Sequence, residues 1–103
     1  MPRYLVTYHD GGMPDGAEAQ RQAMADFVAW TQRVGKALVD PGAPLGPSRV
    51  VSTGSVTEEP VSSPIAGYSI LDAADIAAAA DLVRDHPFVG RGGRLQVIQA
   101  LTP

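Results

Sequence analysis

Two histidines are the side chains of this sequence best suited to proton transfer, because an imidazole titrates near neutral pH. His86 directly precedes Pro87. A proline lacks the N–H that a helix interior requires, so a helix running up to this point must end at about Asp85. That boundary places His86 on the rim of the fold, where it can act as a general acid or base. It can equally be structural, with its ring binding the last free carbonyl groups of the helix.

His9 and Asp40 are the second candidate pair. His9 ends the first predicted strand, and Asp40 follows the first predicted helix. If they lie together, the carboxylate orients the imidazole for general base catalysis. Two simpler interpretations stay open, since residues 9–12 suit a turn and an aspartate before Pro41 suits the end of a helix.

Aromatic and basic side chains indicate a binding pocket. The tyrosines can place a hydroxyl in a cavity while the ring is buried, and the single tryptophan can form a wall of the cavity or belong to the core. The two arginines of the glycine-rich segment 90–94, Arg91 and Arg94, can bind a carboxylate or phosphate, or can face solvent. The candidate ligand-binding residues are Tyr8, Trp30, Tyr68, Phe88 and Arg91.

Composition argues against several other kinds of site. None of the 103 residues is a cysteine, which removes disulfides, thiolate metal sites and cysteine nucleophiles. No compact ligand spacing such as His-x-x-x-His is present, so we expect no metal and no cofactor. The net charge of −3 disfavours nucleic acid and anionic lipid as partners. No apolar run is long enough for a membrane span and no signal peptide is evident, so we expect a cytoplasmic protein.

The hydrophobic pattern predicts a single domain over residues 1–103. Residues 3–8 alternate as a strand does, and residues 17–38 repeat apolar side chains at spacings of three and four, as a helix does. Residues 40–47 contain three prolines and two glycines, which predicts an irregular connection. The remaining expected elements are strands at 48–52, 65–72 and 95–101, a loop able to act as a lid at 53–64, and a second helix ending at about residue 85.

This order of elements predicts an α+β, ferredoxin-like β-α-β-β-α-β fold, with a four-stranded antiparallel sheet and two helices on one face. Both sides of the strands carry apolar residues, so the face without helices needs a cover. A second copy is the simplest cover, which predicts a homodimer through the open sheet faces. The alternative is that the polar residues of these strands allow the face to meet water. Those residues are Thr7, Ser69, Gln96 and Gln99.

Three segments of the chain resemble the YCII-related proteins. They are GKALVDPGAPL at 35–45, GYSILD at 67–72, and DHPFV at 85–89 followed by a closing strand. The resemblance covers nearly the whole chain and implies a dimeric α/β barrel with a small pocket in each protomer. Some relatives are associated with dehydrochlorination or the breakdown of ring compounds. The family's proposed catalytic histidine and aspartate lie on the first helix, where this chain has Met24 and Arg33 instead.

Two functions therefore remain open at the level of sequence. The first is a homodimeric small-molecule-binding protein without catalysis, whose ligand lies in a cleft near His9, Asp40 and His86. Loss of the family's helix-borne pair favours this function. The second is a cofactor-independent lyase or isomerase, in which a histidine moves a proton on a ring-derived or carbonyl compound.

Overall fold

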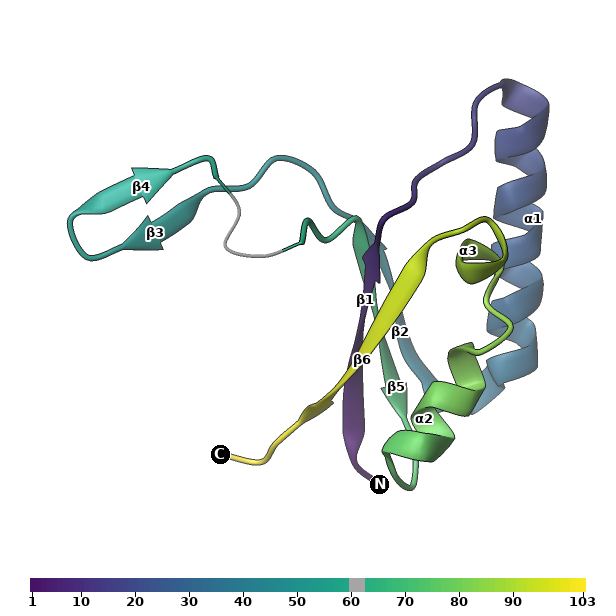
Figure 1. Cartoon of the computed structure of the whole chain (residues 1–103). Coiled ribbons are helices and arrows are strands. Elements are labelled where there is room, and N and C mark those ends of the chain that lie inside the picture. The colour runs from purple at the N-terminus through teal and green to yellow at the C-terminus, as the bar shows by residue number, and fades with distance from the viewer. Residues whose placement is uncertain (60–62) are drawn as a thin grey trace.

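A four-stranded antiparallel sheet forms one layer of the molecule and the helices form the other (Figure 1). The computed structural model describes residues 1–59 and 63–103. In chain order the elements are β1 (Arg3–His9), α1 (Ala17–Val34), a 3-10 turn η1 (Gly35–Ala37), β2 (Leu38–Pro44), β3 (Val50–Ser52), β4 (Ser55–Thr57), β5 (Gly67–Asp72), α2 (Ile76–Val83), α3 (Pro87–Gly90) and β6 (Arg94–Ala100).

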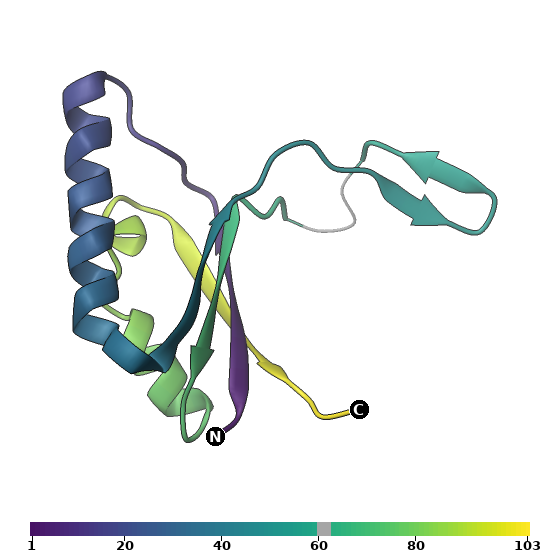
Figure 2. The same ribbon diagram turned by 180° about the vertical axis from the view of Figure 1, so that it is seen from behind.

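The strands of the large sheet follow the order β2-β5-β1-β6, and every neighbouring pair is antiparallel. This order is compatible with a ferredoxin-like arrangement, and the predicted α+β class is confirmed. Figures 1 and 2 show α1, α2 and α3 on the same face of the sheet, which leaves the opposite face without helices. None of the helices in the described residues has the length and apolar character that crossing a membrane requires.

The edge strand β2 corrects the prediction of an irregular connection at 40–47, because residues 40–44 belong to this strand, whereas residues 45–47 are irregular as predicted. Prolines are tolerated there because β2 pairs only with β5, so a missing N–H on the outer side breaks no ladder bond. Two shifts of register bend the strand. Gly42 makes this bend with a φ of +78°, and a Cβ at this position would lie 1.6 Å from the carbonyl oxygen of Tyr68. Only glycine fits this close approach.

The hairpin β3–β4 corrects a second prediction. The strand expected at 48–52 exists over Val50–Ser52, but it pairs with β4 in a separate two-stranded sheet and not with the large sheet. The turn of the hairpin includes Gly54, whose φ is +78°. Figures 1 and 2 show the hairpin projecting on the side of the sheet away from the helices. Part of the loop predicted to act as a lid, residues 60–62, lies outside the described residues.

The core lies between the sheet and the helices. The alternation of β1 directs Tyr4 and Val6 toward the helices, where both are fully buried. Trp30 of α1 is also fully buried, and its indole N–H donates to the carbonyl oxygen of Leu82 at 3.0 Å. The sequence allowed this tryptophan to form a wall of a cavity or to belong to the core, and the structure shows that it is a core residue.

Candidate functional site

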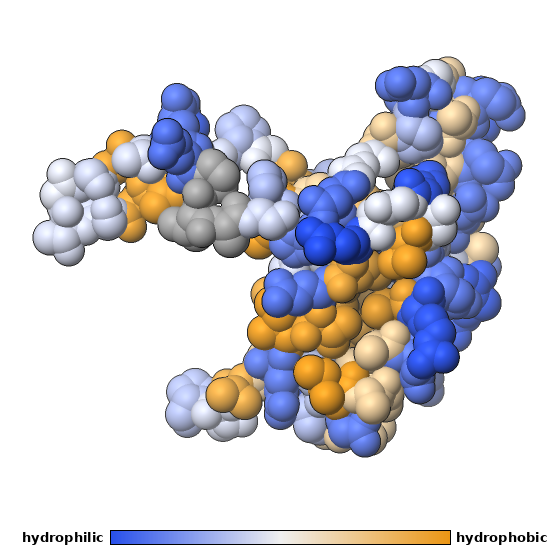
Figure 3. Space-filling view, viewed as in Figure 1, coloured by the Kyte–Doolittle hydropathy of each residue, from blue (hydrophilic) through white to orange (hydrophobic). Residues whose placement is uncertain are grey.

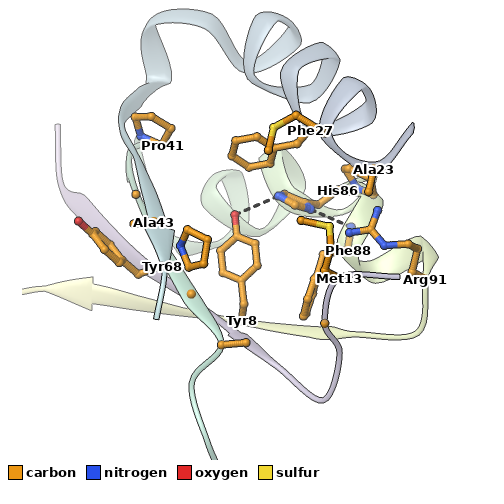
Figure 4. Close-up of a pocket in the computed structure, with 17 residues that line it drawn as sticks. Tyr8, Met13, Ala23, Phe27, Pro41, Ala43, Tyr68, His86, Phe88 and Arg91 are labelled. Carbon is orange, nitrogen blue, oxygen red and sulfur yellow. Dashed lines mark hydrogen bonds between the residues drawn. The ribbon is translucent and has the colours of Figure 1, made fainter. Parts of the chain in front are cut away.

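A cavity of about 360 Å³ opens beside α1, between β2, the start of β5, α3 and the loop that precedes α1 (Figure 4). Its volume falls at the small end of the range found for small-molecule sites. The apolar side chains of the lining include Met13, Ala23, Met24, Phe27, Pro44 and Phe88. The polar residues of the lining are Tyr8, His86, Arg91 and Tyr68, the last with its ring pointing away from Tyr8. The cavity is thus mainly apolar, with a few polar groups that can orient a ligand.

His86 lies at a helix boundary, as its position before Pro87 predicts, but its ring caps the start of the next helix, α3, and not the end of α2. It is the N-cap residue of α3, and its Nδ1 accepts a hydrogen bond from the backbone N–H of Phe88 at 3.0 Å. The backbone N–H of His86, and not its ring, binds the carbonyl of Val83 at the end of α2. The predicted structural role, in which the ring donates to the preceding helix, is therefore wrong.

A chain of hydrogen bonds leads from His86 across the sheet. The Nε2 of His86 lies 3.0 Å from the Tyr8 hydroxyl, which lies 2.8 Å from Oγ of Ser69. The Ser69 hydroxyl in turn donates to the carbonyl oxygen of Pro41 at 2.8 Å.

Both ends of this chain determine where the protons lie. The N–H of Phe88 can only donate, so Nδ1 of His86 is unprotonated and Nε2 carries the proton. The carbonyl of Pro41 can only accept, so the Ser69 proton points to it and the Tyr8 proton points to Ser69. Each group of the chain donates once and accepts once, and none of its hydroxyl or imidazole protons points into the cavity.

Aromatic rings enclose the imidazole of His86, which is 2% exposed. The ring centroid of Trp30 lies 4.3 Å from that of His86, and the edge-on ring of Tyr8 lies at 5.1 Å. The pKa of His86 is lowered from 6.5 to about 4, mainly by this burial. The positive charge of Arg91 also lowers this pKa, by more than the negative charge of Asp85 raises it. Burial also raises the pKa of Tyr8 above 10.0. Both side chains are therefore neutral at pH 7.

The ring of Phe88 reaches the cavity through a space that two glycines leave open. A Cβ on Gly93 would lie 2.2 Å from this ring, and a Cβ on Gly11 would lie 2.9 Å from it. The two glycines, Gly93 in the segment of Arg91 and Gly11 after β1, thus have a packing role that the sequence did not reveal. They allow Phe88 to lie 5.2 Å from the ring of Tyr8, measured between centroids.

His9 lies on the other face of the sheet from His86. Successive side chains of β1 alternate, so Tyr8 faces the helices while Thr7 and His9 face away. The Nε2 of His9 lies 2.7 Å from the Thr7 hydroxyl, and its Nδ1 lies 3.2 Å from the carbonyl oxygen of Pro64. His9 therefore borders a separate surface depression, formed with Ser63 and Arg94.

Asp40 and Tyr68 also lie apart from the groups in the cavity. The carboxylate of Asp40 accepts a hydrogen bond from the backbone N–H of Gly42 at 2.8 Å, which closes a turn inside β2. The His9–Asp40 pair considered from the sequence is thus replaced by two local interactions. Tyr68 borders the cavity, but Figure 4 shows its ring pointing away from Tyr8. Its partner across the strands is Thr7, on the face without helices.

Of the predicted site residues, the structure brings together Tyr8, His86, Phe88 and Arg91. Sequence reasoning missed the contributions of Ala23, Met24 and Ser69. The apolar spacing of three and four in residues 17–38 already places Ala23 and Phe27, four positions apart, on the same side of α1. Alternation along β5 likewise turns Ser69 toward the helices, opposite to Tyr68. Both signals were present, but nothing in them indicated a cavity rather than a filled core.

Comparisons with known proteins do not assign the chain to a family. No protein-family model matches it, and no curated protein matches it. Within residues 1–59 and 63–103, no group of three or more histidine, aspartate or glutamate side chains is placed to hold a metal ion.

The lowered pKa of His86 predicts a specific loss of stability in acid. Between pH 6.5 and about 4, His86 is protonated in the unfolded chain but neutral in the folded chain. The folded state is therefore not penalised by His86 above pH 6.5, and the free energy of unfolding decreases as the pH falls from 6.5 toward 4. In His86→Asn the amide oxygen can still accept from Phe88 but does not titrate. We expect acidification over this range to cost the wild type up to about 3 kcal/mol more than the variant.

The measurement is urea unfolding followed by Trp30 fluorescence at several pH values. The carboxylates titrate in both proteins, so the difference between the two curves isolates His86. Parallel curves for the wild type and His86→Asn would contradict the lowered pKa.

Proposed function

We propose that this chain is a YCII-like, homodimeric small-molecule-binding protein without catalysis, and that its ligand occupies the cavity lined by Phe27, Phe88 and Arg91. The observation that carries this proposal is a mainly apolar cavity of about 360 Å³ at the end of a completed hydrogen-bond chain. An apolar cavity of this kind stabilises a bound apolar molecule through the burial of both surfaces. The ligand thus lies near His86, while His9 and Asp40 lie outside the site.

The state of His86 favours binding over proton transfer. A general base works best when its pKa is near the working pH, and the pKa of His86 is about 4. Its unprotonated nitrogen, Nδ1, already accepts from Phe88, so taking a proton from a ligand would break the cap of α3. His86 therefore supports the cavity wall and keeps the hydroxyl of Tyr8 in place.

The open face of the sheet supports the proposed homodimer. Ile70, Leu5 and Ile98 are directly opposite one another on three adjacent strands, so they form an apolar row across this face. Leu5 is 36% exposed and Ile98 is 40% exposed. Figure 3 shows apolar surface gathered over the strands, between the hairpin and the hydrophilic surface of α1. Pairing two such faces removes these side chains from water.

The hairpin β3–β4 is a second observation in favour of a dimer. An isolated two-stranded hairpin is at best marginally stable in water. Its cross-strand pair Val51 and Val56 is 76% and 65% exposed. Because the hairpin projects on the side of the open face, a second copy on that face lies within its reach (Figure 1). Contact with this copy would shield the two valines.

Filling the cavity should abolish binding of an apolar molecule. We choose the neutral fluorescent probe N-phenyl-1-naphthylamine and the variant Ala23→Phe, whose new ring would enter the cavity. We expect this variant to bind the probe at least about tenfold more weakly than the wild type does. Ala25→Phe is the matched control, since Ala25 is exposed on the same helix and outside the cavity.

Near-ultraviolet circular dichroism of Trp30 shows whether each variant keeps its fold. If Ala23→Phe does not fold, Met24→Phe places a ring at the neighbouring lining position of α1, where the native side chain is 54% exposed. Unchanged probe binding in a folded, filled variant, or the lack of any binding by the wild type, would overturn the proposed site.

The dimer should depend on the apolar row of the open face. Sedimentation equilibrium of the wild type at micromolar concentration should give twice the mass of one chain. Ile98→Glu places charges at the centre of the paired faces, and we expect it to give monomers that remain folded. Val28→Glu is the control, because Val28 is similarly exposed, at 45%, but lies on α1. A monomeric wild type, or a dimeric Ile98→Glu protein, would contradict this interface.

A further inference from the structure

Arg91 differs from the other six arginines of the chain in its electrostatic surroundings. Each of the other arginines pairs with a carboxylate. These pairs are Arg3–Asp72, Arg21–Glu18, Arg33–Asp85, Arg49–Glu58, Arg84–Asp81 and Arg94–Asp10. Within the described residues Arg91 has no such partner, and residues 60–62 are a proline, a valine and a serine, which carry no carboxylate. The arginine without an internal anion is thus the arginine that lines the cavity.

The other polar side chains that face the cavity, Tyr8 and His86, have no proton left to offer a ligand. The Nε2–H of His86 is directed to Tyr8, and the hydroxyl proton of Tyr8 is directed to Ser69. The guanidinium of Arg91 therefore supplies the side-chain donors available to a bound molecule. It presents several N–H groups in one plane, which match the two oxygens of a carboxylate.

Position and charge define the rest of the ligand. Arg91 follows α3 at the exposed end of the cavity, whereas Phe27 and Phe88 line its apolar part (Figure 4). Arg91 is the only arginine or lysine of the lining within the described residues, so one negative charge can be neutralised. A phosphate carries up to two negative charges, of which a single guanidinium neutralises only one.

We propose that the ligand is a monocarboxylate with a compact apolar body, its carboxylate bound by Arg91 and its body packed against Phe27 and Phe88. This inference rests on the binding function proposed above and names the chemical class of its ligand. The positive charge of Arg91 also contributes to the lowered pKa of His86, which agrees with a guanidinium that acts electrostatically inside the site.

The test compares two probes of the same shape, 2-naphthoate and its neutral amide 2-naphthamide, by calorimetry at pH 7.5. We expect the wild type to bind naphthoate roughly tenfold more tightly than naphthamide, the difference that a charged hydrogen bond provides at a partly exposed site. Added salt should weaken only the binding of naphthoate. Arg91→Gln should remove the difference between the probes and leave the binding of naphthamide unchanged.

Arg84→Gln is the matched control. It removes the same charge from an arginine that pairs with Asp81 outside the cavity, and it should behave as the wild type does. Equal binding of the two probes by the wild type, with no effect of Arg91→Gln, would overturn the carboxylate inference and leave the apolar site standing. Weakening of both probes to the same extent by Arg91→Gln would also overturn it, because Arg91 would then only shape the cavity. Binding of neither probe would overturn both the inference and the proposed function.

Discussion

The structure of the candidate site depends on one buried imidazole that is hydrogen-bonded at both nitrogens. Nδ1 of His86 caps α3, while Nε2 begins a chain through Tyr8 and Ser69 to the carbonyl of Pro41. This single network joins α3, β1, β5 and the bend of β2, which enclose the cavity together with α1 and the loop before it. Because each group must be neutral to donate and accept in turn, a charge on His86 would break the network.

The same constraint explains why the two histidines have different roles. The period of two along β1 turns Tyr8 toward the helices and His9 toward the open face, so the sheet separates the two imidazoles. Gly42 is needed at the far end of the chain, since its left-handed backbone lets β2 approach Tyr68 closely. The cavity lies beside this hydrogen-bond chain, with Tyr8 and His86 in its lining. What it offers a ligand is apolar surface and the charge of Arg91.

Periodicity allowed α1, β1 and β5 to be predicted from the sequence, the order of the elements indicated the fold class, and Pro87 indicated the boundary at His86. Periodicity failed at β2, because the prolines indicated an irregular segment and only tertiary pairing shows that they sit on an edge strand. The hydrogen-bond chain was equally out of reach: Tyr8 and Ser69 are 61 residues apart. Which arginine lacks a carboxylate likewise depends on contacts between distant segments, such as Arg94 with Asp10.

The protonation state of His86 is the most direct test of this account. In a ¹⁵N-labelled sample, two-bond correlations of the imidazole at pH 7 report which nitrogen carries the proton. We predict the Nε2–H tautomer, with a proton slow to exchange and a ring that stays neutral until the pH approaches 4. A proton on Nδ1, or a ring that titrates near 6.5 as a solvent-exposed histidine does, would contradict the network on which the site is built.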